Sequence, residues 1–304
     1  MGEMDKQKKT LLGVGAVLML VLLVVVVWVR ATQAKKGAVV MERAVEQLQQ
    51  AGGLHSEINL LINLPERMRS KQRPLTKVTI NLNGDVVKGG QELAVTGNMD
   101  LEAKGPGNIF YAKGELRAFE DKTAFKLSEF PVLLNPSGNL SGKWTYVSTR
   151  LLGIKQDGQP GAVLSRVGEG LEYQGTEKID GEQTWHFSGT VSDEVSKQVQ
   201  EAWRQSNSDN KGMDVVARLL EANRVKQMDV WVSKNKSQLR QIKVNFVRPL
   251  SNGNEFDFAT LEVKLTKYGQ IATIDRPAEE LAVKPEVFAK IFGTGEIKEI
   301  KTEE

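Results

Sequence analysis

The hydrophobic pattern of the chain begins with one long apolar run. Residues 11–29 read LLGVGAVLMLVLLVVVVWV, nineteen residues without a charge, and at about 1.5 Å per helical residue they nearly cross a hydrocarbon core of about 30 Å. The run predicts a transmembrane helix that begins at Leu11 and ends at Val29, with Trp28 at the membrane interface. A signal peptide cleaved after Ala34 is the alternative, although the apolar region of a signal peptide is usually shorter.

The two flanks of this run bear on its orientation. Three lysines precede it and three basic residues follow it, so the positive-inside rule gives nearly a tie. The tail of residues 1–10 is short, whereas the body that follows the run is rich in strand patterns. We therefore expect a single-pass membrane protein with the bilayer as a partner, a cytoplasmic N-terminus and an extracytoplasmic C-terminal domain.

Apolar residues at helical spacing follow the anchor. Val40, Ala44, Val45 and Leu48 fall on one face of a helix, and a glycine pair comes shortly after them. This spacing predicts a stalk helix or linker within residues 30–53 that ends at the glycines.

From residue 75 onward the dominant period of the pattern changes to two. Val78, Ile80 and Leu82 alternate with polar residues, and Asn83-Gly84 is typical of a hairpin turn. The same alternation predicts further strands within residues 93–101, 109–119, 123–127, 227–232, 238–247, 256–266 and 271–274. Short strands with polar turns favour an antiparallel sheet over a parallel α/β sheet.

The last long strand requires an irregularity. Phe256 and Phe258 share one parity of the strand, whereas Leu261 and the apolar residues after it share the other. A β-bulge near Ala259 or Thr260 would bring both groups onto one face.

Amphipathic stretches interrupt and follow the strands. Residues 193–205 and 213–222 predict two helices, and residues 285–292 predict a short terminal one. We expect five parts: a cytoplasmic tail (1–10), a transmembrane anchor (11–29), a stalk (30–53), one β domain (54–284) and a C-terminal helix with a charged tail (285–304).

Composition and charge exclude several classes of site. The chain has no Cys and two His, which excludes a disulfide framework, a thiolate metal site, a catalytic Cys and a multi-histidine metal site. Beyond the first 30 residues, 37 basic side chains stand against 36 acidic ones, and so small a net charge does not favour nucleic acid as a partner. The chain has no GxGxxG or P-loop pattern, so nucleotide binding has no support. With these exclusions we expect no metal and no cofactor.

His186 is the strongest candidate for catalysis. In EQTWHFSG it alternates with Thr184 and Ser188 on one strand face, where a histidine is most often a surface residue or a satisfied strand residue. Spacing alone assigns it no Ser or Asp partner. We therefore expect no catalytic residue and no enzyme.

Apolar side chains on the predicted strands exceed what one ordinary sheet face requires. They either pack a core or line a concavity for an acyl chain or a similar apolar ligand, because curved sheets and barrels enclose such spaces. The candidate ligand-cavity residues are Trp144, Tyr146, Trp185, Phe187, Trp231, Ile242, Val244, Phe246, Phe256 and Phe258.

Strand motifs follow one another in a recognisable order in the second half of the chain. They are YQGTEKIDGEQTWHFSGTVS (173–192), DVWVSKNKSQLRQIKVNF (229–246) and LTKYGQIATIDRP (265–277), and SGKWTYVS (141–148) precedes them. This order resembles the late strands of LppX/LprG-type lipoproteins, which belong to the wider LolA/LolB-like family. The resemblance covers residues 75–277 in element order. The lipobox Cys of those lipoproteins is missing here, and the predicted transmembrane helix would replace it as the anchor.

The resemblance implies a mainly β (α+β) fold: a curved, antiparallel, unclosed β-barrel whose concave face is covered by the helices at 193–205 and 213–222. It also implies a membrane-anchored extracytoplasmic protein that holds a lipid or a lipoprotein acyl chain in a half-barrel cavity. A non-enzymatic cell-envelope scaffold or sensor that binds a protein partner is the alternative, because fold does not settle function. In that case the aromatic residues simply fill a core.

Overall fold

A computed structural model describes residues 37–64, 76–89, 92–105, 108–119, 122–129, 141–148, 170–190, 223–250, 253–271 and 273–277. The predicted membrane segment at 11–29 and the predicted helices at 193–205, 213–222 and 285–292 lie outside the described residues. Within the described ranges, no helix has the length and apolar character needed to cross a membrane.

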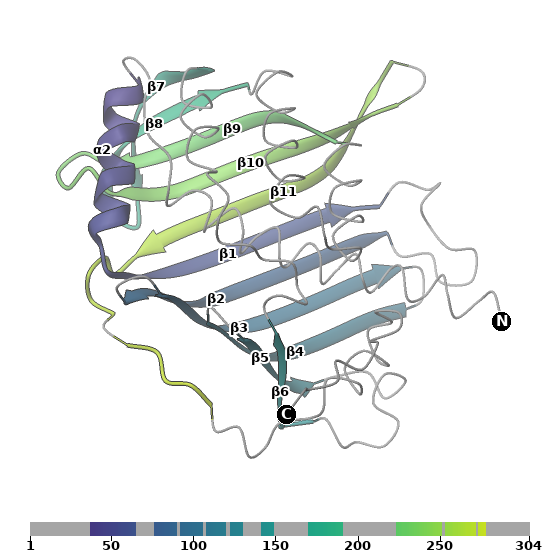
Figure 1. Ribbon diagram of the computed structural model, residues 1–304. Helices are drawn as coiled ribbons and strands as arrows, with labels where there is room; N and C mark the ends of the chain where they lie inside the picture. Colours follow the sequence, from purple (N-terminus) through teal and green to yellow (C-terminus); the bar gives the residue numbers. More distant parts are fainter. Residues whose placement is uncertain are drawn as a thin grey trace, which may run out of the picture.

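Eleven strands form one antiparallel sheet in the order β6-β5-β4-β3-β2-β1-β11-β10-β9-β8-β7 (Figure 1). The strands are β1 (Gly53–Asn63), β2 (Lys77–Gly89), β3 (Glu92–Gly105), β4 (Asn108–Ala118), β5 (Lys122–Glu129), β6 (Trp144–Ser148), β7 (Leu171–Ile179), β8 (Glu182–Gly189), β9 (Arg224–Ser233), β10 (Leu239–Pro249) and β11 (Glu255–Thr266). Because β6 and β7 end this order, the described sheet is not closed. The predicted mainly β, antiparallel, unclosed sheet is confirmed.

The strand β1 joins the two halves of the sheet, and sequence reasoning did not predict it. It pairs with β11 on one side and with β2 on the other. Its buried side chains alternate with more exposed ones, but Ser56 occupies one buried position and Leu61 one of the less buried ones. Because polar and apolar residues occur on both faces of β1, its sequence does not show the regular alternation that predicts a strand.

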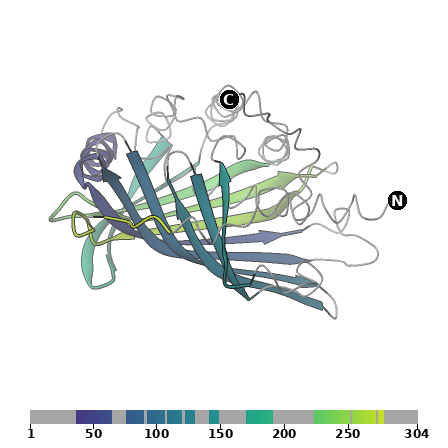
Figure 2. The same cartoon turned by 60° about the horizontal axis from the view of Figure 1, so that its bottom comes forward.

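The helix α2 (Gly37–Gln50) lies within the range where a stalk helix was expected. Ala44 and Leu48 belong to the same buried cluster as the apolar strand residues, and Val40 packs against it. The helix packs mainly against β7, β9 and β10. We call the sheet face that bears α2 and this cluster the inner face, and the opposite face the outer face. Figure 2 shows that the sheet is curved.

The strand β2 passes straight through Asn83-Gly84, so the hairpin turn predicted there is wrong. Gly84 lies opposite Gly97 of β3. A Cβ atom added to Gly84 would stand 1.8 Å from the carbonyl oxygen of Thr96 and 2.3 Å from the Cα of Gly97. The glycine therefore permits a close approach of two neighbouring strands, which is the other common use of glycine inside a sheet.

The strand predicted at residues 271–274 is also wrong, because β11 already has β10 and β1 as its two neighbours. After β11, the backbone N–H of Gly269 donates to the carbonyl oxygen of Gly53 at 2.7 Å, and the chain then leaves the sheet. It continues to the β4–β6 side of the sheet, where Arg117 of β4 donates to the carbonyl oxygen of Asp275 at 2.8 Å.

Candidate functional site

The inner face gathers seven of the ten predicted ligand-cavity residues. Four belong to its buried cluster and three pack against that cluster: Phe187, Ile242, Val244 and Phe258, with Trp185, Phe246 and Phe256. These seven side chains come from three strands, β8, β10 and β11. Together with the β9 residues that lie between β8 and β10, they belong to one apolar cluster on the inner face.

Cross-strand register explains why these residues meet. Residues that face one another on adjacent strands lie on the same side of a sheet. One such row crosses six strands on the inner face: Phe187, Val230, Ile242, Val263, Ile58 and Leu82. The apolar inner face therefore extends well beyond the strands that α2 contacts.

A bulge in β11 adds two aromatic rings to this face. Pairing with β10 runs from Ala259 directly to Asp257, so Phe258 has no facing residue on β10. The bulge expected near Ala259 is thus present one residue earlier. It allows both Phe256 and Phe258 to join the inner cluster.

The other three predicted residues, Trp144, Tyr146 and Trp231, lie on the outer face. Trp144 lies opposite Lys126, and its ring centroid is 5.0 Å from the guanidinium carbon of Arg117 and 5.8 Å from the Lys126 Nζ. Tyr146 shares its parity on β6, and Trp231 pairs with polar neighbours described below. These three rings do not line the surface formed by the other seven.

One charged residue that sequence reasoning missed, Arg248, lies at the end of the inner face. Its side chain is buried, at 6% relative exposure. Its guanidinium carbon stands 4.6 Å from the centroid of the Phe258 ring, within the range of a cation–π contact. Its Nε donates to the Oδ1 of Asn223 at 3.0 Å, and Phe256 faces it on β11.

The acidic residues of the same hairpin lie on the outer face. Glu255 accepts a hydrogen bond from Arg224, and this contact lowers the pKa of the Glu255 carboxyl below its ordinary value. The Nζ of Lys226 lies 3.7 Å from Glu255 and 3.6 Å from Asp257. The hairpin therefore carries paired surface charges on one side and a buried guanidinium on the other.

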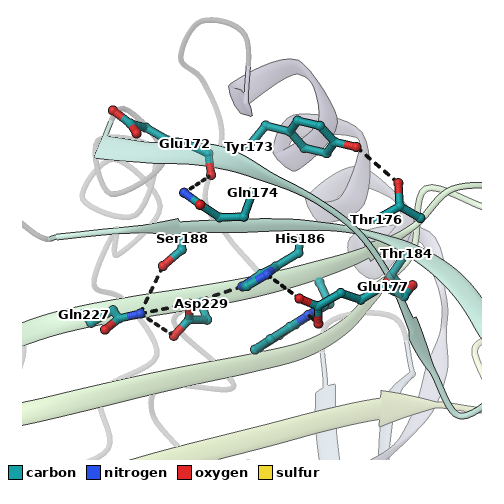
Figure 3. Close-up of polar contacts among 11 residues, drawn as sticks. Glu172, Tyr173, Gln174, Thr176, Glu177, Thr184, His186, Ser188, Gln227 and Asp229 are labelled. Atoms are coloured by element: carbon teal, nitrogen blue, oxygen red, sulfur yellow. Dashed lines mark hydrogen bonds and ion pairs between the residues drawn. The ribbon is translucent and has the colours of Figure 1, made fainter.

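A polar cluster on the outer face of β7–β9 contains the second histidine (Figure 3). The His186 Nδ1 lies 2.9 Å from the Oε1 of Glu177, and its Nε2 lies 3.2 Å from the Oδ1 of Asp229. Trp231 donates from Nε1 to the Oε2 of Glu177 at 2.9 Å. Gln227 donates to both carboxylate oxygens of Asp229 at 3.2 Å.

This arrangement gives His186 a bridging position. Both ring nitrogens face carboxylates, and both can donate at once only when the ring is protonated. A general base needs a nitrogen directed at the substrate, and here each nitrogen is already engaged within the cluster. Within the described ranges, no group of three or more His, Asp or Glu side chains is arranged to hold a metal ion.

A partly buried phenol lies near the start of β10. The Tyr268 hydroxyl donates to the carbonyl oxygen of Leu239 at 2.5 Å, and its ring packs against the inner cluster. Burial raises the pKa of the Tyr268 phenol well above its ordinary value because an ionised phenolate would be poorly solvated. The neutral hydroxyl therefore satisfies a backbone acceptor at this end of the inner face.

No protein-family model matches the chain, and no curated protein matches its sequence. Among solved structures, the chain is similar to the lipoprotein LppX of Mycobacterium tuberculosis, with 14% identity and a TM-score of 0.42 over 78% of this chain and 97% of LppX. It is similar to LprF from Mycobacterium bovis, with 14% identity and a TM-score of 0.44 over 82% of this chain and 100% of LprF.

An outer membrane lipoprotein-sorting protein domain from Vibrio parahaemolyticus is also similar, with 8% identity and a TM-score of 0.21 over 74% of this chain and 89% of that domain. The proteins that the sequence motifs resemble are thus found again among these structural neighbours.

Proposed function

We propose that the protein is a membrane-anchored, extracytoplasmic, non-enzymatic protein that binds a lipid or acyl chain against the inner face of its open sheet. The observation that carries the proposal is the extent of that face. Its buried apolar side chains continue across β1–β4, as Ile58, Ile80, Leu101 and Leu116 illustrate, whereas α2 packs mainly on β7, β9 and β10. The apolar inner face is therefore larger than the part that α2 contacts, which supports an apolar partner in addition to the helix.

The physical chemistry of acyl chains fits such a face. Each buried methylene contributes about 0.8 kcal/mol of favourable transfer free energy, so an acyl chain gains affinity from contact length alone. The eleven residues of β10 span roughly 35 Å at about 3.3 Å per residue. The hydrocarbon core of a bilayer is about 30 Å thick, and the acyl chains of one leaflet fill half of it. A single acyl chain is therefore shorter than β10.

The sequence supplies the remaining parts of the proposal. The apolar run at 11–29 would hold the domain at the bilayer surface, and the predicted helices at 193–205 and 213–222 would cover the ligand from the concave side. A fixed anchor favours local capture or transfer of lipid over long-range shuttling.

Two substitutions at adjacent residues test the proposal. Phe246 packs on the inner cluster, whereas Asn245 on the outer face accepts a hydrogen bond from Thr260 at 3.2 Å. Phe246→Asp places a carboxylate on the proposed binding face, and Asn245→Asp places the same group on the other side of the same strand. We expect Phe246→Asp to lose the lipid that can be extracted from the purified full chain, and Asn245→Asp to retain it.

A third variant is needed because Phe246→Asp can also destabilise the fold. Phe246→Ala leaves no charge, and we expect it to bind less lipid while unfolding cooperatively in urea. Equal lipid content in the wild type and all three variants would overturn the proposal. A lipid-free wild type that instead purifies with a stoichiometric protein partner would support the scaffold or sensor alternative.

A further inference from the structure

Exposed lysines gather at the end of the sheet that α2 crosses. They lie at the end of β2, at the end of β7, in the β9–β10 turn and in the turn after β11: Lys88, Lys178, Lys234, Lys236 and Lys267. We call this set the lysine patch. Within the described part of the chain, none of the five side chains forms an ion pair.

Backbone contacts fix the lysine patch at this one end. Lys178 faces Gln183 across the β7–β8 hairpin, and the backbone N–H of Lys234 donates to the carbonyl oxygen of Gln183 at 3.0 Å. The N–H of Lys88 donates to the carbonyl oxygen of Gly52, just before β1, at 2.6 Å. Because antiparallel neighbours alternate in direction, these turns and strand ends share the end of the sheet where β1 begins and β11 ends. Figures 1 and 2 show α2 and the β9–β10 turn together at this end.

The helix α2 brings the chain from the predicted membrane anchor to the same end. Its 14 residues span about 21 Å, and the strand spacings from β1 to β7 add up to about 24 Å. Since α2 ends just before β1 and also contacts β7, its first turn lies on the β7 side. Residues 30–36 separate the predicted anchor from Gly37, a reach of at most about 25 Å. An anchor at 11–29 therefore keeps the α2 end of the domain near the bilayer.

From these positions we propose that the lysine patch docks on the anionic headgroups of the membrane in which the chain is anchored. The domain then stands on its α2 end, and the β10–β11 hairpin, at the other end of the sheet, points away from the bilayer. This rests on the membrane anchor of the proposed function and adds to it a contact surface, a partner and an orientation.

The charges around the patch favour an anionic partner. Asp180 and Glu177 beside the β7–β8 turn and Glu46 on α2 are exposed carboxylates, and Glu177 is already held by His186. The five lysines outnumber these carboxylates. Each lysine near an anionic membrane surface strengthens the contact about fivefold, so several lysines at one end of a domain are sufficient to orient it.

The first turn of α2 adds two features that suit a membrane surface. It contains no acidic residue, so no carboxylate within that turn neutralises the partial positive charge of the helix N-terminus. Val39, in the same turn, is 48% exposed. An exposed apolar side chain beside cationic groups is typical of helices that lie at a membrane interface.

Fluorophores at two positions test the orientation, because the chain has no Cys and one can be introduced at a chosen site. Asn235→Cys lies between the two lysines of the β9–β10 turn, and Asp257→Cys lies at the other end of the sheet, where the Asp257 side chain is 84% exposed. The labelled full chain is reconstituted into nanodiscs of phosphatidylcholine, with or without added phosphatidylglycerol. Lipids with a nitroxide on the headgroup quench a label that lies at the bilayer surface.

A variant with four neutralised lysines tests the role of charge. The patch variant combines Lys178→Gln, Lys234→Gln, Lys236→Gln and Lys267→Asn. Asn is chosen at the last position because Lys267 has a φ of 51°, in the left-handed region that Asn tolerates. The control variant neutralises four lysines that form ion pairs with described carboxylates, so that the net charge changes equally: Lys104→Gln, Lys113→Gln, Lys126→Gln and Lys226→Gln.

We expect the label at position 235 to be quenched at least about twofold more in the discs with phosphatidylglycerol than in the neutral discs, because the lysines act together. The excess should disappear in the patch variant and at about 1 M salt, where the Debye length falls to about 3 Å. It should persist in the control variant. The label at position 257 should stay unquenched in both kinds of disc.

Failure of the proposed function and failure of the docking surface give different results. A chain that enters neither kind of disc contradicts the membrane anchor of the proposed function. Equal quenching at position 235 in both discs, or an excess that the patch variant keeps, overturns the docking surface alone. Quenching at position 257 instead would place the other end of the sheet on the bilayer and also overturn it. If the patch variant does not fold, the salt series of the labelled chain decides, and an excess that salt leaves unchanged counts against the proposal.

Discussion

The imidazole of His186 lies parallel to the indole of Trp231, with ring centroids 4.5 Å apart and planes inclined by 7°. The stacked pair lies on the outer face, and Glu177 contacts both rings. Because Glu177 belongs to the end strand β7, this contact fastens the edge of the sheet to β8 and β9. The cluster therefore has a structural role that is separate from the inner face.

Replacement of His186 tests whether the outer-face cluster is independent of lipid binding on the inner face. We expect His186→Leu to lower the free energy of unfolding by about 1–3 kcal/mol, because Glu177 and the largely buried Asp229 each lose a hydrogen-bond partner. His55, which has the same 15% side-chain exposure and a single contact to Asp85, provides a matched control. His55→Leu should cost less, and neither variant should change the lipid content. Urea unfolding of the full chain and organic extraction measure the two effects.

The glycine pair in the middle of β2 and β3 yields a second prediction. A Cβ atom at Gly84 would overlap the β3 backbone, whereas one at Gly97 would stand 3.1 Å from its nearest neighbour, the carbonyl oxygen of Asn83. Gly84→Ala should therefore destabilise the protein by about 2 kcal/mol or more, and Gly97→Ala should cost clearly less. Thermal unfolding of both variants checks the order, and equal losses would mean that the two strands relax apart freely.

Much of the fold was predictable because a half-buried strand carries its own pattern. The alternation of Val78, Ile80 and Leu82 predicted β2, and similar periods predicted most of the other strands. The same pattern cannot identify a glycine that is needed for close strand contact, since Asn83-Gly84 is also the commonest hairpin turn sequence. It also missed β1, because Ser56 occupies a buried position in an otherwise apolar row.

The sequence predicted which types of residue form the candidate site. It predicted only in part on which face of the sheet each of them lies. Trp231 stands between Val230 and Val232, and all three are buried, so period two cannot tell which residues of β9 point inward. A shift of one residue exchanges the two faces of a strand, and only the partners of Trp144 and Trp231 reveal that they lie outside. The burial of Arg248 could not be predicted from the sequence, because its contacts with Phe258 and Asn223 form only when the strands pair.

The partly buried phenol of Tyr268 predicts a stability loss in alkaline solution. Its folded-state pKa is raised, so the stabilisation is fully present below the unfolded value of about 10 and is lost as the pH rises towards the folded value. In that window the unfolded chain ionises first, and stability falls by about 1.4 kcal/mol per pH unit from this group.

The variant Tyr268→Phe removes that ionisation. Its urea midpoint should be lower than that of the wild type at pH 8, because the carbonyl oxygen of Leu239 loses its donor, and the difference should narrow between pH 10 and pH 11.5. A difference that stays constant over this range would show that the phenol ionises equally in both states.

The central claim is that the inner face holds an apolar ligand, and native mass spectrometry of the gently purified full chain tests it most directly, combined with organic extraction of whatever is bound. We predict a lipid or acyl-chain species in near-stoichiometric amount, released when the protein unfolds. A full-length protein that is folded, empty and unable to take up added oleate would contradict the claim, and the inner face would then be an ordinary packed core.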